Sequence, residues 1–119
     1  MELSFRKKNS TIIIMVSGEI DHHTSKELRR QTENAYIEMG VKNIIFHFEK
    51  VSFMDSSGIG MLIGRYKQLQ SMGGRIAIVA ANNKISEIIK FSGLSKIIPL
   101  FDTIEDAFSY TERREHHVV

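Results

Sequence analysis

The sequence predicts an α/β domain whose mixed β-sheet opens with an antiparallel hairpin and is covered by about four helices. Three observations predict this architecture. Two strand patterns follow one another at the N-terminus, helical and strand patterns alternate after them, and the two most apolar strand patterns lack a polar face. Strands that are apolar on both sides are buried between helices, so we expect the later strands to be parallel and central.

The opening hairpin is expected from residues 2–7 and 11–18. The second strand contains the β-branched run Thr11-Ile-Ile-Ile-Met-Val16, a composition that favours strands. Only Lys8-Asn9-Ser10 separates the two, which indicates a tight connection.

The first helix is expected to begin at Thr24-Ser-Lys-Glu27, which has the spacing of a capping box, and to stop at Gly40. Between these points, residues that can be buried recur at helical spacing: Leu28, Thr32, Ala35, Tyr36 and Met39. The preceding Asp21-His22-His23 is expected to be a surface loop rather than a metal site, because adjacent side chains rarely converge on one ion and no third ligand is evident.

The two buried strands are expected at residues 43–48 and 75–80, with a helix over residues 57–72 between them. A further helix carries Ile85, Ile88 and Ile89 and stops at Ser92-Gly93. A last helix is expected to begin near Thr103.

Length and composition favour one domain over residues 1–119, with its core over about residues 3–110, since 119 residues of which 42% are hydrophobic suit a single core. The charged run Glu112-Arg-Arg-Glu115 and the following His116-His117 are expected to form a short, solvated and frayed tail.

Charge and cysteine content exclude several function classes. Sixteen Lys plus Arg against 14 Asp plus Glu give a net charge of +2, and the basic residues are scattered, which argues against direct binding of nucleic acid. No apolar run approaches the roughly 18 residues of a membrane span, and the N-terminus lacks a secretory pattern. With no cysteine, the cytoplasm is the expected compartment, and no metal or cofactor is expected.

A polar cluster within residues 51–66, at the junction between the buried strand of residues 43–48 and the following helix, carries most of the functional information. If Ser57 is the cap or the first helical residue, its hydroxyl lies beside unpaired backbone N–H groups and the positive end of the helix dipole, where a phosphate can be accommodated. An ordinary N-cap is the alternative interpretation, because serine is a preferred cap.

The same helix has two different sides. The side expected to face the sheet carries Ile59, Leu62, Ile63, Tyr66 and Leu69. The side of Ser57 carries Gly60, Met61, Gly64, Gln68 and Ser71, and is therefore small, flat and nearly uncharged. Each glycine costs about 1 kcal/mol in a helix interior, so either a neighbouring element of this chain or another protein should approach closely there.

Enzymatic interpretations find little support. Ser57 is preceded by Met54-Asp55-Ser56, so the G-x-S-x-G elbow of serine hydrolases is absent. Gly58-Ile-Gly60 is only a fragment of a dinucleotide fingerprint, and no G-K-[ST] phosphate loop occurs. A non-enzymatic binding module is therefore expected. The alternative is a response-regulator-like receiver phosphorylated on Asp55, although receivers open with a single parallel strand rather than a hairpin.

Phe53-Met-Asp-Ser-Ser-Gly-Ile-Gly60 resembles the D-S-S-G phosphorylation motif of STAS-domain anti-sigma factor antagonists. Gly18-Glu-Ile-Asp-His-His-Thr24 and Ser92-Gly-Leu-Ser-Lys-Ile-Ile98 are similar to other segments of that family, and the likeness covers about residues 3–110. Together with Gly64-Arg-Tyr-Lys67, it is strongest to the members that control the sporulation sigma factor sigma-F.

The resemblance implies a STAS-type domain and a partner switch. The unphosphorylated form would bind a kinase anti-sigma factor, which brings its own ATP or ADP, and release sigma-F. That kinase would phosphorylate Ser57 and so inactivate the protein, and a serine phosphatase would restore it. The implied partner-binding residues are Asp21, Asp55, Ser56, Ser57, Gly58, Gly60, Met61 and Gly64.

Overall fold

The computed structural model describes residues 1–81 and 83–113 and contains one five-stranded sheet. The strands are β1 (Glu2–Lys8), β2 (Thr11–Ile20), β3 (Asn43–Met54), β4 (Ile76–Val79) and β5 (Leu100–Phe101). The helices are α1 (His22–Glu38), α2 (Ser56–Ser71), α3 (Asn83–Phe91), α4 (Ile104–Thr111) and the short 3₁₀ helix η1 (Leu94–Lys96). The sheet order is β1-β2-β3-β4-β5, with β1 antiparallel to β2 and all other pairs parallel, which confirms the mixed sheet and its opening hairpin.

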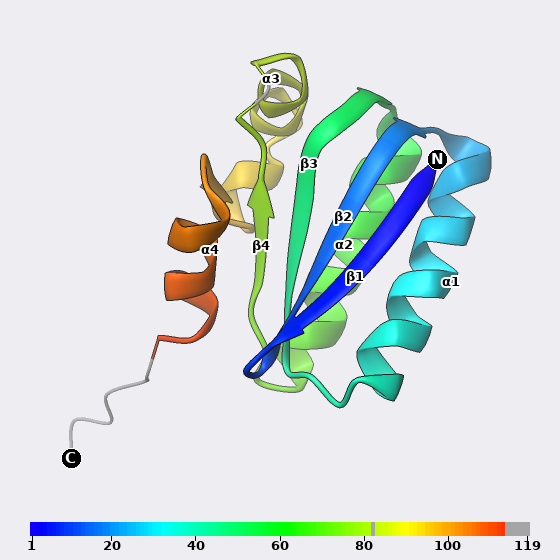
Figure 1. Cartoon of the computed structure of the whole chain (residues 1–119). Helices are drawn as coiled ribbons and strands as arrows, with labels where there is room; N and C mark the ends of the chain where they lie inside the picture. The colour runs from blue at the N-terminus through cyan, green and yellow to red at the C-terminus, as the bar shows by residue number, and fades with distance from the viewer. Residues whose placement is uncertain (82, 114–119) are drawn as a thin grey trace.

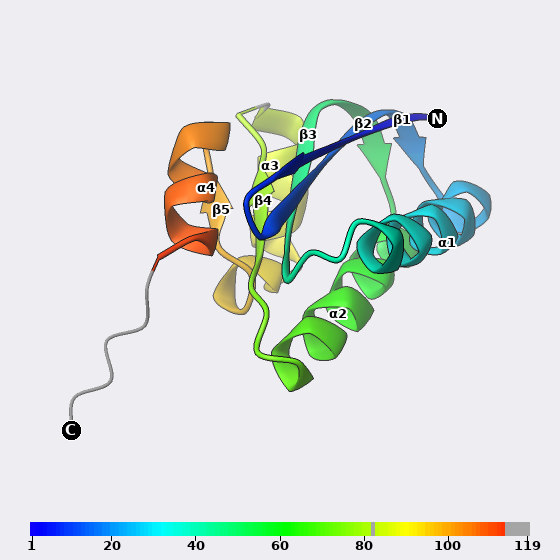
Figure 2. The ribbon, with the colours of Figure 1, turned by 60° about the horizontal axis from the view of Figure 1, so that its bottom comes forward.

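The two faces of the sheet are covered by different helices. Alternate side chains of the strands, such as Ile12 and Ile14, join the larger core beneath α1, α2 and α3. The residue between them, Ile13, belongs to a smaller core with Ala107 of α4. Figures 1 and 2 show α1 and α2 side by side along one face, with α4 placed against β4. The period-two alternation of the strands therefore separates the two layers.

Strand β3 is longer than predicted. It continues to Met54 because it remains paired with β2 as far as Ile20, through two register shifts. The length matters for the site, since it brings the carboxyl ends of β2 and β3 to the same level. The two-residue strand β5 and helix η1 were not predicted, because segments this short have no periodicity of their own.

The predicted start of the first helix was wrong. Helix α1 begins at His22, and Asp21, not Thr24, is its N-cap. Thr24 is the third helical residue and completes a capping box with Asp21: the Asp21 N–H donates to Thr24 Oγ1 at 2.8 Å, and Thr24 N–H donates to Asp21 Oδ1 at 2.9 Å. Aspartate and threonine are both good caps, and the reciprocal bond to Asp21 decides between them. His22 and His23 are consequently helical and not part of a loop.

Glu112, which was expected in the frayed tail, is instead part of a hydrogen-bond network that fixes the end of α4. Its carboxylate accepts from the Ser10 N–H at 3.3 Å, Thr11 Oγ1 at 2.6 Å and Asn43 Nδ2 at 3.2 Å. The Asn43 amide also donates to the Thr111 carbonyl at 3.0 Å. The network ties the C-terminal helix to the first hairpin and to β3. Residues 114–117 of the predicted tail lie outside the described residues.

Candidate functional site

The candidate site lies where two parallel strands end and two helices begin. Ile20 and Met54, the last residues of β2 and β3, are paired, and the Asp55 N–H donates to the Ile20 carbonyl at 3.2 Å. An N-capping aspartate follows each strand, Asp21 for α1 and Asp55 for α2. Two helix N-termini, each with its partial positive charge, therefore lie next to one another.

Ser57 is the second residue of α2 and does not cap it, which corrects the predicted helix start. The cap is Asp55, whose Oδ1 accepts from the Ser57 N–H at 2.8 Å. The Ser57 side chain is half-buried, and its Oγ lies 3.5 Å from Nδ1 of His22, the first residue of α1. This distance is at the long limit for a hydrogen bond.

Asp21, which precedes His22 in the chain, has an ionised carboxylate at neutral pH. Its Oδ1 accepts from the backbone N–H groups of His23 and Thr24, each at 2.9 Å. The hydrogen bonds from the backbone and then from the side chain of Thr24 lower the pKa of Asp21. The junction of the two helices therefore carries negative charge before any modification of Ser57.

A groove of about 200 Å³ runs from Ser57 between α1 and α2. It is lined by Ser25, Lys26, Arg29, Ser57, Gly60, Met61, Gly64 and Arg65. A Cβ atom added at Gly60 or Gly64 would meet nothing within 4 Å. These glycines therefore do not serve tight packing within the described chain, which overturns one of the two interpretations left open by their spacing.

Gly58 differs from the other two glycines. It is buried, and a Cβ atom there would lie 2.7 Å from Met54 Cγ and 3.0 Å from Ile20 Cγ2. The absence of a side chain at position 58 thus lets α2 pack on the ends of β2 and β3. Close packing therefore accounts for the glycine at position 58, and the partner contact that the D-S-S-G resemblance implies for it stays a prediction.

Alanine substitutions at these glycines should have effects of opposite sign. Gly60→Ala should raise the free energy of unfolding by about 1 kcal/mol, because a helix interior gains from alanine and the new methyl group meets open space. Gly58→Ala should lower it by about 1–3 kcal/mol, because Met54 and Ile20 must move. Urea unfolding followed by circular dichroism measures both; destabilisation by Gly60→Ala would show that something in the chain occupies that space.

Two predictions about the Ser57 side of α2 were wrong. Met61 was expected on an exposed docking face but is only 7% exposed and belongs to the larger core. The groove is not nearly uncharged, since α1 contributes Lys26 and Arg29, and Arg65 is buried in its wall. Both errors have one cause: α2 packs against α1 as well as against the sheet, which turns its buried side toward Met61 and Arg65.

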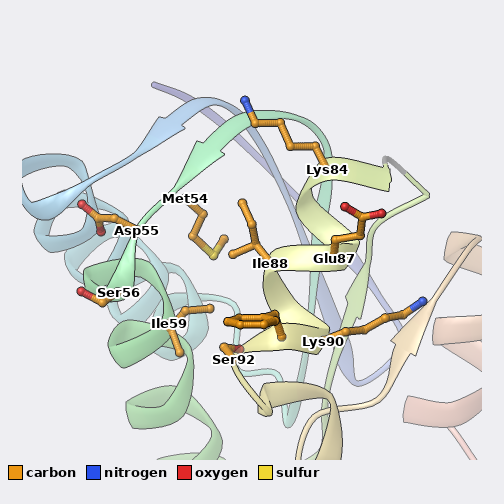
Figure 3. Close-up of a pocket in the computed structure, with 10 residues that line it drawn as sticks. Met54, Asp55, Ser56, Ile59, Lys84, Glu87, Ile88, Lys90 and Ser92 are labelled. Carbon is orange, nitrogen blue, oxygen red and sulfur yellow. The ribbon is translucent and has the colours of Figure 1, made fainter.

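Asp55 and Ser56 border a second hollow at the α2 N-terminus, although Figure 3 shows their polar groups directed away from it. This hollow has a volume of about 1010 Å³, and its walls are the end of β3, the first turns of α2, and α3. Figure 3 shows Met54, Ile59 and Ile88 pointing into the space between α2 and α3, with the ends of Lys84 and Lys90 directed outward. Phe91, at its rim, is 96% exposed.

The predicted site residues are therefore divided between two surfaces that meet at the start of α2. Ser57, Gly60, Met61 and Gly64 line the α1–α2 groove, whereas Asp55 and Ser56 line the apolar hollow. Asp21 caps α1 at the neighbouring strand end. Lys26 and Arg29 were not predicted as site residues, although their i,i+3 spacing places them on one side of α1. Phe91 was not predicted either, because only Ile85, Ile88 and Ile89 were used to recognise that helix.

No helix among the described residues is long and apolar enough to span a membrane. In the same part of the chain, no group of three His, Cys, Asp or Glu side chains is arranged to hold a metal ion.

Comparison with known proteins places the chain in a family. The model of the STAS domain matches residues 2–107. An anti-sigma F factor antagonist of Paenibacillus polymyxa is 33% identical over 112 residues, which cover 94% of this chain and 96% of that protein. The chain therefore belongs to the STAS domain family.

Within that family it groups with the anti-sigma factor antagonists of the SpoIIAA type. The structure of unphosphorylated SpoIIAA has a TM-score of 0.73 and 28% identity, and the match covers 95% of this chain and 100% of that one. The phosphorylated form of SpoIIAA, described as a Bacillus cell fate determinant, has a TM-score of 0.69 and 31% identity, with 92% and 98% covered.

Proposed function

We propose that this protein is an anti-sigma factor antagonist that works as a partner switch. Its unphosphorylated form binds a kinase anti-sigma factor together with that protein's ATP or ADP, and so releases sigma-F. The kinase then phosphorylates Ser57, the antagonist dissociates, and a serine phosphatase restores it. The cycle takes place in the cytoplasm, and the antagonist binds without catalysing a reaction.

The observation that carries this proposal is the position of the Ser57 hydroxyl. It lies where two helix N-termini meet and at the end of a groove whose glycines face open space. A partner backbone can approach Gly60 and Gly64 closely, which a larger side chain would prevent. The relatives support the same role, because an antagonist of the SpoIIAA type is known in both an unphosphorylated and a phosphorylated form.

Phosphorylation would act on this surface through charge and size. A phosphoryl group adds about −1.5 to −2 charge and three acceptor oxygens. At Ser57 it would stand next to His22, the residue that follows the ionised Asp21, and two residues from Asp55, the N-cap of α2. Repulsion and bulk at this point would prevent the close contact that the unphosphorylated surface permits.

Phosphorylation of Asp55, as in a receiver, is less compatible with the geometry. The Asp55 carboxylate accepts from the Ser57 N–H, and the Asp55 carbonyl accepts from the N–H groups of Gly58 and Ile59. Modification of that carboxylate would remove the cap of α2 and disturb the helix that carries the rest of the site.

The test is to incubate the protein with its purified kinase anti-sigma factor and ATP, and to map the modification by intact-mass and peptide mass spectrometry. We expect one acid-stable phosphoryl group, located on Ser57. Ser56→Ala is the matched control and should still be modified, whereas Ser57→Ala should not. An acid-labile group on Asp55 would refute the serine switch and favour the receiver.

A further inference from the structure

The α1–α2 groove has an excess of positive charge over the carboxylates that pair with it. Lys26, Arg29 and Arg65 line it, and within the described residues the one carboxylate paired with any of them is that of Glu33. A single oxygen, Glu33 Oε1, accepts from Arg29 Nε at 3.3 Å and also from Arg65 Nη1. No ion pair engages Lys26 among residues 1–81 and 83–113. Arg29 and Arg65 thus share one carboxylate, and Lys26 is left without an ion-pair partner in this part of the chain.

Arg65 shows that the charge in this groove is held in place. Arg65 is only 6% exposed, and its Nε has no hydrogen-bond partner within the described residues. The hydrogen bond from Arg65 is the main cause that lowers the pKa of Glu33. A buried guanidinium that is incompletely paired favours the arrival of a further anion nearby.

The groove also limits the kind of anion that fits. About 200 Å³ is enough for one or two side chains but not for a helix. Its floor is made by Gly60 and Gly64, so a polypeptide backbone can reach it. The capping carboxylates of Asp21 and Asp55 at the start of the helices would repel a long polyanion such as nucleic acid.

We propose that this groove receives an Asp or Glu side chain of the anti-sigma factor, whose carboxylate pairs with Lys26 and Arg29. The inference rests on the proposed function and specifies the chemistry of the partner. It also gives the switch a second component: a phosphoryl group on Ser57 would lie at the end of the groove and compete for the same cations. The antagonist would then supply from its own chain the anion that the partner supplies in the complex.

The experiment compares two variants of α1 that remove positive charge at exposed positions. Lys26→Gln combined with Arg29→Gln should weaken binding to the purified kinase anti-sigma factor with ADP by about tenfold, and should make the affinity less dependent on salt. The control, Arg30→Gln, removes a charge that pairs with Glu27 and does not line the groove, so it should leave affinity unchanged. Thermal unfolding measures whether the variants remain folded.

A charge reversal identifies the occupant. Lys26→Glu should bind poorly, and one Asp→Lys or Glu→Lys substitution on the partner surface should restore binding to it. Wild-type affinity in the double glutamine variant, or no restoring substitution in a scan of the partner's acidic residues, would overturn the groove inference and leave the Ser57 switch intact. A wild-type protein that neither binds the kinase nor is phosphorylated would refute the proposed function, and the groove inference with it.

Discussion

Ser57→Asp is expected to weaken binding of the anti-sigma factor by about 100-fold, because like charges brought together at an interface cost several kcal/mol. The new carboxylate would lie near the ionised Asp21 and the cap Asp55, at the end of the groove floored by Gly60 and Gly64. Ser57→Ala removes only the hydroxyl and should keep wild-type affinity while escaping phosphorylation. Isothermal titration of each variant with the purified partner and ADP measures the difference.

The control places the same charge elsewhere on the same helix. Ser71 was predicted on the same side of α2 as Ser57, but it is exposed at the far end of the helix and does not line the α1–α2 groove. Its hydroxyl donates to the Gln68 carbonyl within the helix. Ser71→Asp should therefore bind as the wild type does. If Ser71→Asp and Ser57→Asp weakened binding equally, net charge rather than the location of Ser57 would explain the loss.

Asn43→Ala is expected to lower the free energy of unfolding by about 2–4 kcal/mol, because it leaves several buried groups without partners. Asn43 is 4% exposed and links three parts of the chain. Its Nδ2 donates to the Thr111 carbonyl at 3.0 Å and to Glu112 at 3.2 Å, and its Oδ1 accepts from the Arg75 N–H at 2.9 Å. Chemical denaturation measures the loss. It is followed by circular dichroism because the chain has no tryptophan.

Asn34→Ala is the matched control, since Asn34 is exposed on α1 and should change stability by less than about 0.5 kcal/mol. Phosphorylation of Ser57 should persist in the folded Asn43→Ala protein, because the network lies at the opposite end of the strands from the site. Equal stability of the two variants would show that the network contributes nothing to the fold.

The fold was predictable where a segment has a hydrophobic periodicity or a residue composition typical of one kind of secondary structure. The β-branched run of β2 and the apolar runs of β3 and β4 predicted buried strands, and the structure confirms them. The capping residues were less predictable. Asp21, Thr24, Asp55 and Ser57 are all acceptable caps by type, and only the backbone geometry shows that the two aspartates perform that role.

Only the part of the site that lies within one continuous segment of the chain could be predicted. The motif placed Ser57 and its neighbours at the start of a helix, and the structure agrees. Two of the three cations of the groove, Lys26 and Arg29, come from α1, which no pattern within residues 51–66 can show. Glu112 was likewise misread, because a charged residue near a chain end resembles a solvated tail until its partners Thr11 and Asn43 are located.

At Gly60 and Gly64, the residue that would be best for the stability of α2 differs from the residue that would be best for partner binding. Alanine at both positions would add about 2 kcal/mol to the stability of the isolated protein, by the difference in helix propensity. The same two methyl groups would occupy the space in the α1–α2 groove that a partner backbone needs for close contact. A selection for thermal resistance alone should therefore fill positions 60 and 64 early and lose partner capture in the same step. The sequence of helix α2 therefore gives up some stability of the isolated protein in order to leave space for a partner backbone.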